Sequence, residues 1–320
     1  MMLRMKLAPL DLRPYVWNKA TLASRVCPFC GALGFEKLIR PDELTIRFCK
    51  KCGTYFVSPA PSEFALSEFY KKYSRIQRPR GSLDKAQAKV IERTSPFSDF
   101  RVCEFASMTN LKGKRVLDVG FGTGEMLYRL RQLGAIVEGI DLDIDNVQSV
   151  KSLLNLNVYC KTLDEIRGEK YDLIIMHDLI EHLLNPFDLL KKCYLMLNDK
   201  GLISIFTPNA SFAHREKNPI LFRVDLEHLN YITFQTCRYI ADSLKMQEIH
   251  LESIGFPFLG NIVEQNSGVS KNPIKILRGL ARNTPIESCY DFVNRVMLSK
   301  KRKINLDRRG SYSLFLILQK

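Results

Sequence analysis

The strongest constraint on the fold is a short apolar strand that runs into a glycine-rich loop and then into a helix. Residues 116–120 read Val-Leu-Asp-Val-Gly, residues 121–124 read Phe-Gly-Thr-Gly, and a helical pattern covers 125–133. A strand, a glycine loop and a helix in this order begin a doubly wound sheet. The glycines allow a ligand to approach the backbone, and the N-terminus of the helix directs amide hydrogens toward it. The sequence therefore predicts an α/β protein with a nucleotide-type pocket.

A second strand is predicted over 136–141, and it ends in an acid, Asp141. A carboxylate at this position can accept both hydroxyls of a ribose. A dinucleotide-binding protein would open its helix with the pattern G-x-G-x-x-G. Here the order is D-x-G-x-G-x-G, from Asp118 through Gly120, Gly122 and Gly124, so no third glycine stands where a pyrophosphate needs it. The pattern argues against a dinucleotide.

Further strands are predicted near Val158 and over 171–176, 201–207, 249–256 and 311–318. Residues 171–176 are nearly all apolar, as expected of a strand buried on both faces. Together with the glycine loop, this order resembles the class I S-adenosylmethionine-dependent methyltransferases over about residues 100–260 and the last strand. The resemblance implies a Rossmann-like, doubly wound sheet of seven strands with an antiparallel pair last.

The resemblance also implies a cofactor, S-adenosyl-L-methionine, and the residues that hold it. In that family the glycine loop receives the methionine part, and the acid that ends the second strand holds the ribose. The adenine lies beside the residues that follow the third strand. From its position after the fourth strand, we also expect His177 to line the cofactor site. The cofactor residues assigned in this way are Asp118, Gly120, Gly122, Gly124, Asp141, Thr162, Leu163 and His177.

Two pairs of cysteines near the start of the chain predict a small metal-binding module. The pattern is C-x2-C, 18 residues, then C-x2-C, and a glycine follows each pair. Two ligands separated by two residues can sit on one tight turn, and four thiolates form the closed tetrahedral site typical of structural zinc. A short strand is predicted between the pairs, over 45–48, as in a zinc ribbon. The predicted zinc ligands are Cys27, Cys30, Cys49 and Cys52.

The segment 52–59, followed by Phe69 and Tyr70, resembles the lead-in of bacterial methyltransferases that carry an N-terminal zinc ribbon. Such enzymes often modify sugars of nucleotide-activated hexoses, antibiotics or surface polysaccharides. The catalytic part also resembles the ubiquinone-pathway O-methyltransferases. We expect residues 1–75 to form the zinc-ribbon module with its lead-in helix, and residues 85–320 to form the methyltransferase domain, with a basic helical insertion at 261–309.

Two regions offer a histidine as the general base that a hydroxyl acceptor needs near its proton. We prefer His228, in the loop after the fifth strand, with Glu227 or Asp225 to orient it. His182, after the fourth strand, is the second candidate for a catalytic histidine. The resemblance supports the first choice, because related sugar methyltransferases carry Glu-His in the corresponding loop.

A metal site is the alternative for the same region. Asp178, Glu181 and His182 stand at i, i+3 and i+4, so one helical turn would place them together. With His228 added, two carboxylates and two imidazoles suit Mg²⁺, Mn²⁺ or Zn²⁺. A similar arrangement occurs in small-RNA 2′-O-methyltransferases and, in part, in the ubiquinone methyltransferases, whereas many relatives with Glu-His need no metal.

The net charge is +14, and much of the excess lies late in the chain, where residues 271–309 hold 11 Lys or Arg against 3 Asp or Glu. Over 271–303, basic residues at helical spacing stand opposite an apolar stripe, a pattern typical of helices that lie on anionic membranes. A substrate lid with a solvated basic face is the other interpretation. Binding to nucleic acid is a third, but beyond the zinc ribbon no recognition motif accompanies the charge.

No stretch approaches the roughly 18 apolar residues that span a membrane, and charges interrupt the start where a signal peptide needs an apolar core. We expect a cytoplasmic protein, or one peripheral to the inner face of the membrane. The expected function is methyl transfer to a small molecule, namely a nucleotide- or lipid-linked sugar in surface polysaccharide or secondary metabolite biosynthesis. RNA 2′-O-methylation and quinone-type O-methylation are the alternatives.

Overall fold

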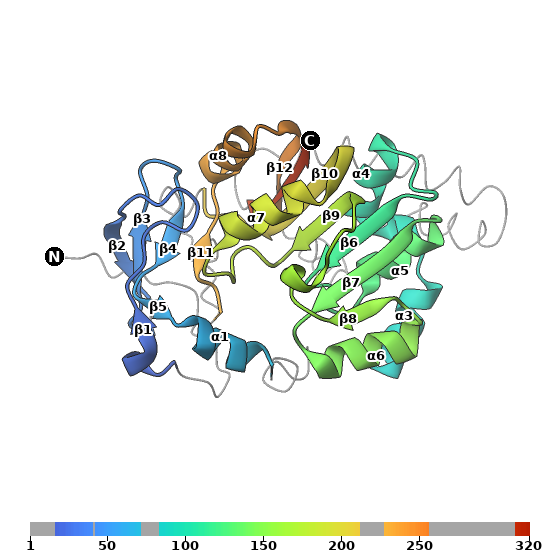
Figure 1. Cartoon of the computed structure of the whole chain (residues 1–320), viewed down its shortest axis with the longest axis horizontal. Helices are drawn as coiled ribbons and strands as arrows, with labels where there is room; N and C mark the ends of the chain where they lie inside the picture. Colours follow the sequence, from blue (N-terminus) through green and yellow to red (C-terminus); the bar gives the residue numbers. More distant parts are fainter. Residues whose placement is uncertain (1–16, 41, 72–82, 212–226, 256–310) are drawn as a thin grey trace, which may run out of the picture.

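The computed structural model describes residues 17–40, 42–71, 83–211, 227–255 and 311–320. Figure 1 shows a large sheet flanked by helices and, beside it, a smaller group of strands formed near the N-terminus. Among the described residues, no helix is long and apolar enough to cross a membrane. The basic segment 271–303, interpreted above as amphipathic helices, lies outside the described residues, as does Asp225.

Seven strands form the large sheet, in the order β12-β13-β10-β9-β6-β7-β8. Their bounds are β6 (Arg115–Val119), β7 (Ile136–Asp141), β8 (Val158–Cys160), β9 (Tyr171–His177), β10 (Leu197–Pro208), β12 (Gln247–Gly255) and β13 (Ser311–Gln319). Strands β6 to β10 are parallel to one another, whereas β13 pairs antiparallel with both β10 and β12. The predicted seven-stranded, doubly wound sheet with a final antiparallel pair is therefore confirmed.

Helices cover both faces of this sheet (Figure 1). They are α3 (Lys85–Arg93), α4 (Phe100–Met108), α5 (Glu125–Gln132), α6 (Ile144–Leu154), α7 (Pro186–Leu195) and α8 (Phe234–Leu244), with short 3-10 turns η2 (Pro96–Ser98) and η3 (Leu163–Glu165). Along β9, Ile174 and Met176 join a core that includes α7 and α8. The alternate residues Leu173 and Ile175 join the core on the opposite face, with α4, α5 and α6. Both sets are buried, which explains the continuous apolar run of this strand.

Residues 17–71, called the N-terminal module below, form two small sheets. The bounds of their elements are η1 (Lys19–Thr21), β1 (Leu22–Ala23), β2 (Phe35–Ile39), β3 (Thr45–Phe48), β4 (Tyr55–Val57), β5 (Ala60–Pro61) and α1 (Glu63–Tyr70). Strand β1 pairs with β5, and β2, β3 and β4 form consecutive antiparallel pairs. The strand expected over 45–48 is confirmed as β3, and α1 leads from the small sheets toward the large one (Figure 1).

The sheet that contains β2, β3 and β4 has a fourth strand, which comes from a much later part of the chain. Strand β11 (Asn230–Tyr231) pairs antiparallel with β4, so that Asn230 lies opposite Phe56 and Tyr231 opposite Tyr55. This strand begins two residues after His228. The N-terminal module and the loop that carries the predicted base therefore share one sheet, a connection that the sequence did not indicate.

Candidate active site

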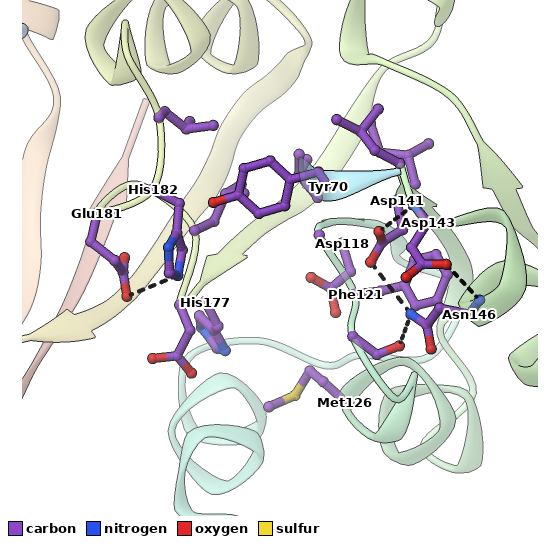
Figure 2. A pocket seen from close by; sticks show the side chains of 18 of the residues that line it. Tyr70, Asp118, Phe121, Met126, Asp141, Asp143, Asn146, His177, Glu181 and His182 are labelled. Carbon is purple, nitrogen blue, oxygen red and sulfur yellow. Dashed lines mark hydrogen bonds and ion pairs between the residues drawn. The ribbon is translucent and has the colours of Figure 1, made fainter. Parts of the chain in front are cut away.

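A cavity of about 620 Å³ opens where the parallel strands β6, β7 and β9 end. This volume suits a small-molecule ligand. The predicted site residues that line it are Asp118, Gly120, Gly122, Asp141, Thr162, Leu163, His177, His182, Glu227 and His228. Figure 2 shows several of these side chains around the cavity. The fold thus brings all the residues predicted to bind the cofactor except Gly124 into one space with those predicted for catalysis.

The glycine loop between β6 and α5 adopts the left-handed conformation at three glycines. Gly120, Gly122 and Gly124 have φ of 75°, 55° and 70°, values that glycine adopts without strain. At Gly122 no heavy atom lies within 4 Å of an added Cβ, so the backbone borders open space. Gly124 lies outside the cavity lining and caps α5, where an added Cβ would stand 2.6 Å from Val150 of α6. Gly122 therefore keeps the backbone accessible, and Gly124 allows two helices to pack closely.

Asp118, near the end of β6, is buried, and its burial raises the pKa of the carboxyl to about 7. The positive charge of Arg101 opposes this shift. Arg101 lies on α4, lines the same cavity and forms a bidentate ion pair with Asp99, with Nη2–Oδ2 at 2.7 Å and Nε–Oδ1 at 3.1 Å. The sequence did not identify Arg101, because a single arginine on an amphipathic helix carries no spacing signal.

Asp141 ends β7 at the cavity, and the start of α6 orients its carboxylate. Its Oδ1 accepts a hydrogen bond from the Asp143 amide at 3.0 Å, and its Oδ2 lies 3.5 Å from Nδ2 of Asn146. The same Nδ2 donates to the carbonyl of Gly122 at 2.6 Å (Figure 2). Burial raises the pKa of Asp141. Asn146, which the sequence did not single out, thus links the acid of the second strand to the glycine loop.

His177 ends β9 and is held in one neutral tautomer. Nη1 of Arg101 lies 3.3 Å from its Nδ1, and because a guanidinium only donates, Nδ1 accepts. Nε2 therefore carries the proton and donates to Oγ of Ser204 at 2.8 Å. Burial, aided by the charge of Arg101, lowers the pKa of His177 well below its usual value. With both nitrogens engaged, His177 suits a role in shaping the cavity rather than in moving a proton.

The segment after β9 forms an irregular turn, so the prediction of a helical turn at Asp178, Glu181 and His182 is wrong. Asp178 has φ of 50°, outside the α-helical region, so residues 178–182 do not form one helical turn. Instead, ligand atoms of Glu181, His182 and His228 lie within 4.8 Å of one another. This cluster forms through a tertiary contact with the loop at 227–229, and Asp178 is not part of it.

His182 and His228 lie next to each other at the cavity, with ring centroids 4.8 Å apart and ring planes at 62°. Nδ1 of His182 lies 3.3 Å from the backbone carbonyl oxygen of Glu227. A carbonyl only accepts, so Nδ1 carries the proton and Nε2 keeps its lone pair. Burial, followed by the effect of His228, lowers the pKa of His182 to about 4. His182 is therefore neutral near pH 7 and offers one accepting nitrogen.

Tyr70, the last residue of α1, also lines the cavity, so the N-terminal module contributes to it directly. Figure 2 shows its ring pointing across the cavity toward His182, and the two ring centroids lie 6.4 Å apart. The sequence indicated Tyr70 only as part of the lead-in to the methyltransferase domain. Its place in the wall follows from the direction of α1, which the sequence does not specify.

The sulfur atoms of the four predicted zinc ligands, Cys27, Cys30, Cys49 and Cys52, lie within 4.8 Å of one another. The Sγ–Sγ distances of Cys27–Cys52 and Cys30–Cys49 are both 3.3 Å. Ideal zinc–sulfur bonds of about 2.3 Å in a tetrahedron separate the sulfurs by about 3.8 Å. In each turn, the glycine after the pair donates to the carbonyl of the first cysteine, at 2.9 and 2.8 Å. The predicted four-cysteine cluster is confirmed, and its geometry is compatible with zinc.

Comparison with known proteins gives separate evidence on the class of the protein. Residues 92–243 match a family model described as a methyltransferase domain. The ubiquinone biosynthesis O-methyltransferase of Rhodopseudomonas palustris strain HaA2 is 26% identical over 228 residues, which cover 68% of this chain and 87% of that protein. The protein of the same name from Bradyrhizobium diazoefficiens is 34% identical over 112 residues, which cover 33% of this chain and 44% of that protein.

Among solved structures, a SAM dependent methyltransferase from Archaeoglobus fulgidus aligns with a TM-score of 0.47 and 21% identity, over 71% of this chain and 96% of that one. The matched model and the sheet order identify residues 92–243 as an S-adenosylmethionine-dependent methyltransferase domain of class I type, and the chain is related to the ubiquinone O-methyltransferases. The class predicted from the sequence is confirmed.

Proposed function

We propose that the chain transfers a methyl group from S-adenosylmethionine to a hydroxyl group of a small, sugar-type acceptor. The observation that carries this proposal is the pair of imidazoles, His182 and His228, in the same cavity as the glycine loop and Asp141. The glycine loop and Asp141 would hold the cofactor, and the two histidines would border an acceptor in the same cavity. Among methyl acceptors, a neutral hydroxyl gains from an adjacent base, because it must lose its proton as the new bond forms.

The cofactor half of the cavity would be built from the residues at the ends of β6, β7 and β8. Asp141 would accept the ribose hydroxyls, while Thr162 and Leu163 would border the adenine. The methionine part of the cofactor carries both an ammonium and a carboxylate. The opposite charges of Asp118 and Arg101, both at the cavity, suit such a group.

Bound S-adenosylmethionine supplies a methyl group on a sulfonium, which is already electrophilic. The protein has to align the acceptor oxygen with this methyl group, exclude water and accept the hydroxyl proton. His228 would take the proton at a ring nitrogen, and the neighbouring carboxylate of Glu227 would stabilise the imidazolium. Nε2 of His182, which keeps its lone pair, would accept a hydrogen bond from the acceptor and help to orient it.

The four cysteines would hold one structural zinc ion, since four thiolates close the coordination shell and leave no position for a substrate. Zinc would then contribute to the folding of the N-terminal module and not to the chemical step. The group of Glu181, His182 and His228 is the alternative place for a divalent cation. We favour proton transfer there, and the two readings differ in their response to chelators.

A phenolic hydroxyl is the second candidate acceptor, because the Rhodopseudomonas palustris relative is named a ubiquinone biosynthesis O-methyltransferase. We favour a sugar because polar side chains surround the histidines, among them those of Tyr70, Glu181 and Glu227. These groups can exchange hydrogen bonds with several hydroxyls of one acceptor. RNA 2′-O-methylation would use the same chemistry and would show salt-dependent binding of RNA.

An acceptor screen tests the proposal. The full chain, loaded with zinc, is incubated with S-adenosylmethionine and three probes: UDP-glucose, 3,4-dihydroxybenzoate and a short RNA oligomer. Products are identified by mass spectrometry and NMR. The proposal expects an O-methylated hexose, formed together with an equal amount of S-adenosylhomocysteine. Methylation of the phenol alone would favour the second candidate, and a product methylated at carbon or nitrogen would contradict both.

A further inference from the structure

A fully buried arginine of the N-terminal module contacts the main chain of the proposed catalytic base. Arg40 follows β2, and its Nη1 donates to the backbone carbonyl of His228 at 2.6 Å and to the hydroxyl of Tyr231 at 3.2 Å. The rest of the guanidinium forms a bidentate ion pair with Asp42, at 3.0 and 2.6 Å. A bidentate pair fixes the plane of a guanidinium. The module therefore presents Nη1 to the catalytic loop in one orientation.

The peptide group between His228 and Leu229 is held at both ends. Its carbonyl accepts from Arg40, and its N–H, on Leu229, donates to the backbone carbonyl of Glu181 at 2.8 Å. Glu181 directly precedes His182, whose imidazole lies beside that of His228. The hydrogen bonds of this peptide group therefore fix the backbone at His228 relative to the backbone at Glu181, next to His182.

The next peptide group repeats the arrangement. The carbonyl of Leu229 accepts from Nη2 of Arg25 at 2.7 Å and from the amide of Val57 at 2.8 Å. Its N–H, on Asn230, donates to the same carbonyl of Glu181 at 2.9 Å. Two consecutive peptide groups are therefore fixed between the N-terminal module on one side and the turn after β9 on the other. Buried polar bonds of this kind are costly to leave unmade.

We propose that Arg40 is a positioning residue, through which the N-terminal module sets the imidazole of His228 against that of His182. This inference rests on the proposed role of His228 as the base. Arg40 does not line the cavity and would act only through the backbone of the loop. Without Arg40, the carbonyl of His228 loses a buried donor, the loop relaxes, and the two rings no longer hold one relative orientation.

The experiment measures the geometry of the two rings and needs no acceptor. Full-length, zinc-loaded protein with protonated histidine rings in a deuterated background is examined by NMR in the presence of S-adenosylhomocysteine. His228→Ala and His182→Ala assign the resonances. In the unsubstituted chain we expect a ring–ring NOE between His182 and His228, whose centroids are 4.8 Å apart. In Arg40→Met this NOE is expected to fall about twofold or more while the His228 resonance broadens through exchange on the μs–ms timescale.

Arg47→Met is the matched control. Arg47 belongs to the same module, but its guanidinium contacts Gly34, Glu36 and Ser58 and not the catalytic loop. This variant should keep the NOE at full strength, and the ring of His250, on β12, should keep its resonance in every variant. An equal loss of the NOE in Arg47→Met would show a general effect of module stability and would overturn the inference.

A folded Arg40→Met protein with an unchanged NOE would also overturn it. If Arg40→Met does not fold, Arg40→Lys and Arg40→Gln decide, because each alters the donor to the His228 carbonyl and keeps part of the packing of the arginine side chain. An unchanged NOE in both would reject the inference. The test of Arg40 can be told apart from the test of the proposed function. If His228→Ala is inactive but the NOE is unchanged in Arg40→Met, only the positioning role is rejected. If His228→Ala is fully active, only the role of His228 as the base is rejected.

Discussion

The Nδ1 atom of His182 lies 3.3 Å from the backbone carbonyl oxygen of Glu227, in the peptide that leads into His228. This contact fixes the tautomer of the His182 imidazole. The carbonyl that fixes it belongs to Glu227, the residue directly before His228. Because burial lowers the pKa of His182 to about 4, the ring is neutral near pH 7. A ring nitrogen of such low basicity is a poor proton acceptor, so the proposed base is His228 rather than His182.

Substitution of His228 tests this assignment. His228→Ala is expected to lower turnover by about 10²–10⁴-fold, the usual contribution of a positioned general base, with the affinity for S-adenosylhomocysteine nearly unchanged. Turnover is measured on the acceptor that reacts in the screen, and cofactor affinity by calorimetry. His250→Ala, outside the cavity lining, is the control and should retain normal turnover. Full activity of His228→Ala would leave alignment of the acceptor as the source of catalysis.

The response to divalent cations separates proton transfer from metal catalysis. If His228 acts as a base, EDTA in the reaction should leave turnover unchanged as long as the structural zinc stays bound. If Glu181, His182 and His228 hold a cation, EDTA should abolish turnover and Mg²⁺ or Mn²⁺ should restore it. Glu181→Gln would then be as damaging as His228→Ala. Zinc content has to be measured in each sample, because loss of the structural ion would resemble the second result.

Much of the fold could be predicted from the sequence because its signals are local. The apolar run at Ile174 and Ile175 and the glycines after Val119 each lie within one strand or loop, where period and composition specify the element. The pairing of β11 with β4 could not be predicted in this way. Asn230 and Tyr231 form a strand of two residues, too short to show a period, and their partners lie far away in the sequence.

The site shows the same division. Asp141 was found because it ends a recognisable strand, and the cysteines because their spacing matches the geometry of a metal turn. Arg101 and Asn146 were missed because each is one polar residue on a helix, and only tertiary packing turns it toward the cavity. The prediction from the spacing of Asp178, Glu181 and His182 was wrong for a related reason. It required a helical turn, and the left-handed backbone at Asp178 interrupts such a turn.

Binding of the cofactor should depend on pH through Asp118. The pKa of this carboxyl is raised from its usual value of 3.8 to about 7, so near neutrality the folded protein binds a proton that the unfolded chain has lost. The ammonium of the cofactor, if it lies near Asp118, favours the carboxylate form of this side chain. Cofactor binding should therefore release a proton. The affinity should rise with pH up to about 7, by at most tenfold per pH unit. Calorimetry in two buffers of different ionisation enthalpy counts the protons released.

Asp118→Asn is the matching variant for this effect. It removes the titrating group, so the affinity for S-adenosylmethionine should fall and lose its dependence on pH. Its effect on the free protein has a defined sign. Keeping a carboxylate in a site that raises its pKa destabilises the fold increasingly between pH 3.8 and about 7 and constantly above that range. The melting temperature of the free variant at pH 8 should therefore exceed that of the unsubstituted chain, and a lower value would contradict the assignment.

Asp141 is expected to contribute to cofactor affinity through the ribose. Asp141→Ala should weaken binding of S-adenosylmethionine by about 1–3 kcal/mol, the cost of leaving a polar ligand group without its partner. Asp164→Ala is the control, because this acid is 68% exposed and pairs with Lys192 away from the cavity lining. Calorimetry measures both. Equal affinity of Asp141→Ala and Asp164→Ala would remove Asp141 from the set of cofactor residues.

Loss of zinc should reduce turnover far more than it reduces cofactor binding. Cys49→Ser removes one of four thiolates and is expected to leave the purified protein with less than about half an equivalent of zinc. The N-terminal module carries Arg25 and Arg40, which hold the loop of His228, whereas the proposed cofactor residues follow β6, β7 and β8. Disorder in the module should therefore displace the base and leave the cofactor half of the cavity folded.

Three quantities are measured in the same preparation. Elemental analysis gives the zinc content, calorimetry with S-adenosylhomocysteine gives the cofactor affinity, and an assay with the reacting acceptor gives the turnover. Cys160→Ser is the control, because this cysteine lies exposed on β8, outside the four-cysteine group. It should keep zinc, cofactor affinity and turnover. A zinc-free Cys49→Ser protein with normal turnover would show that the module is not needed to hold His228. Equal loss of cofactor affinity and turnover would show instead that the module and the methyltransferase sheet fold as one cooperative unit.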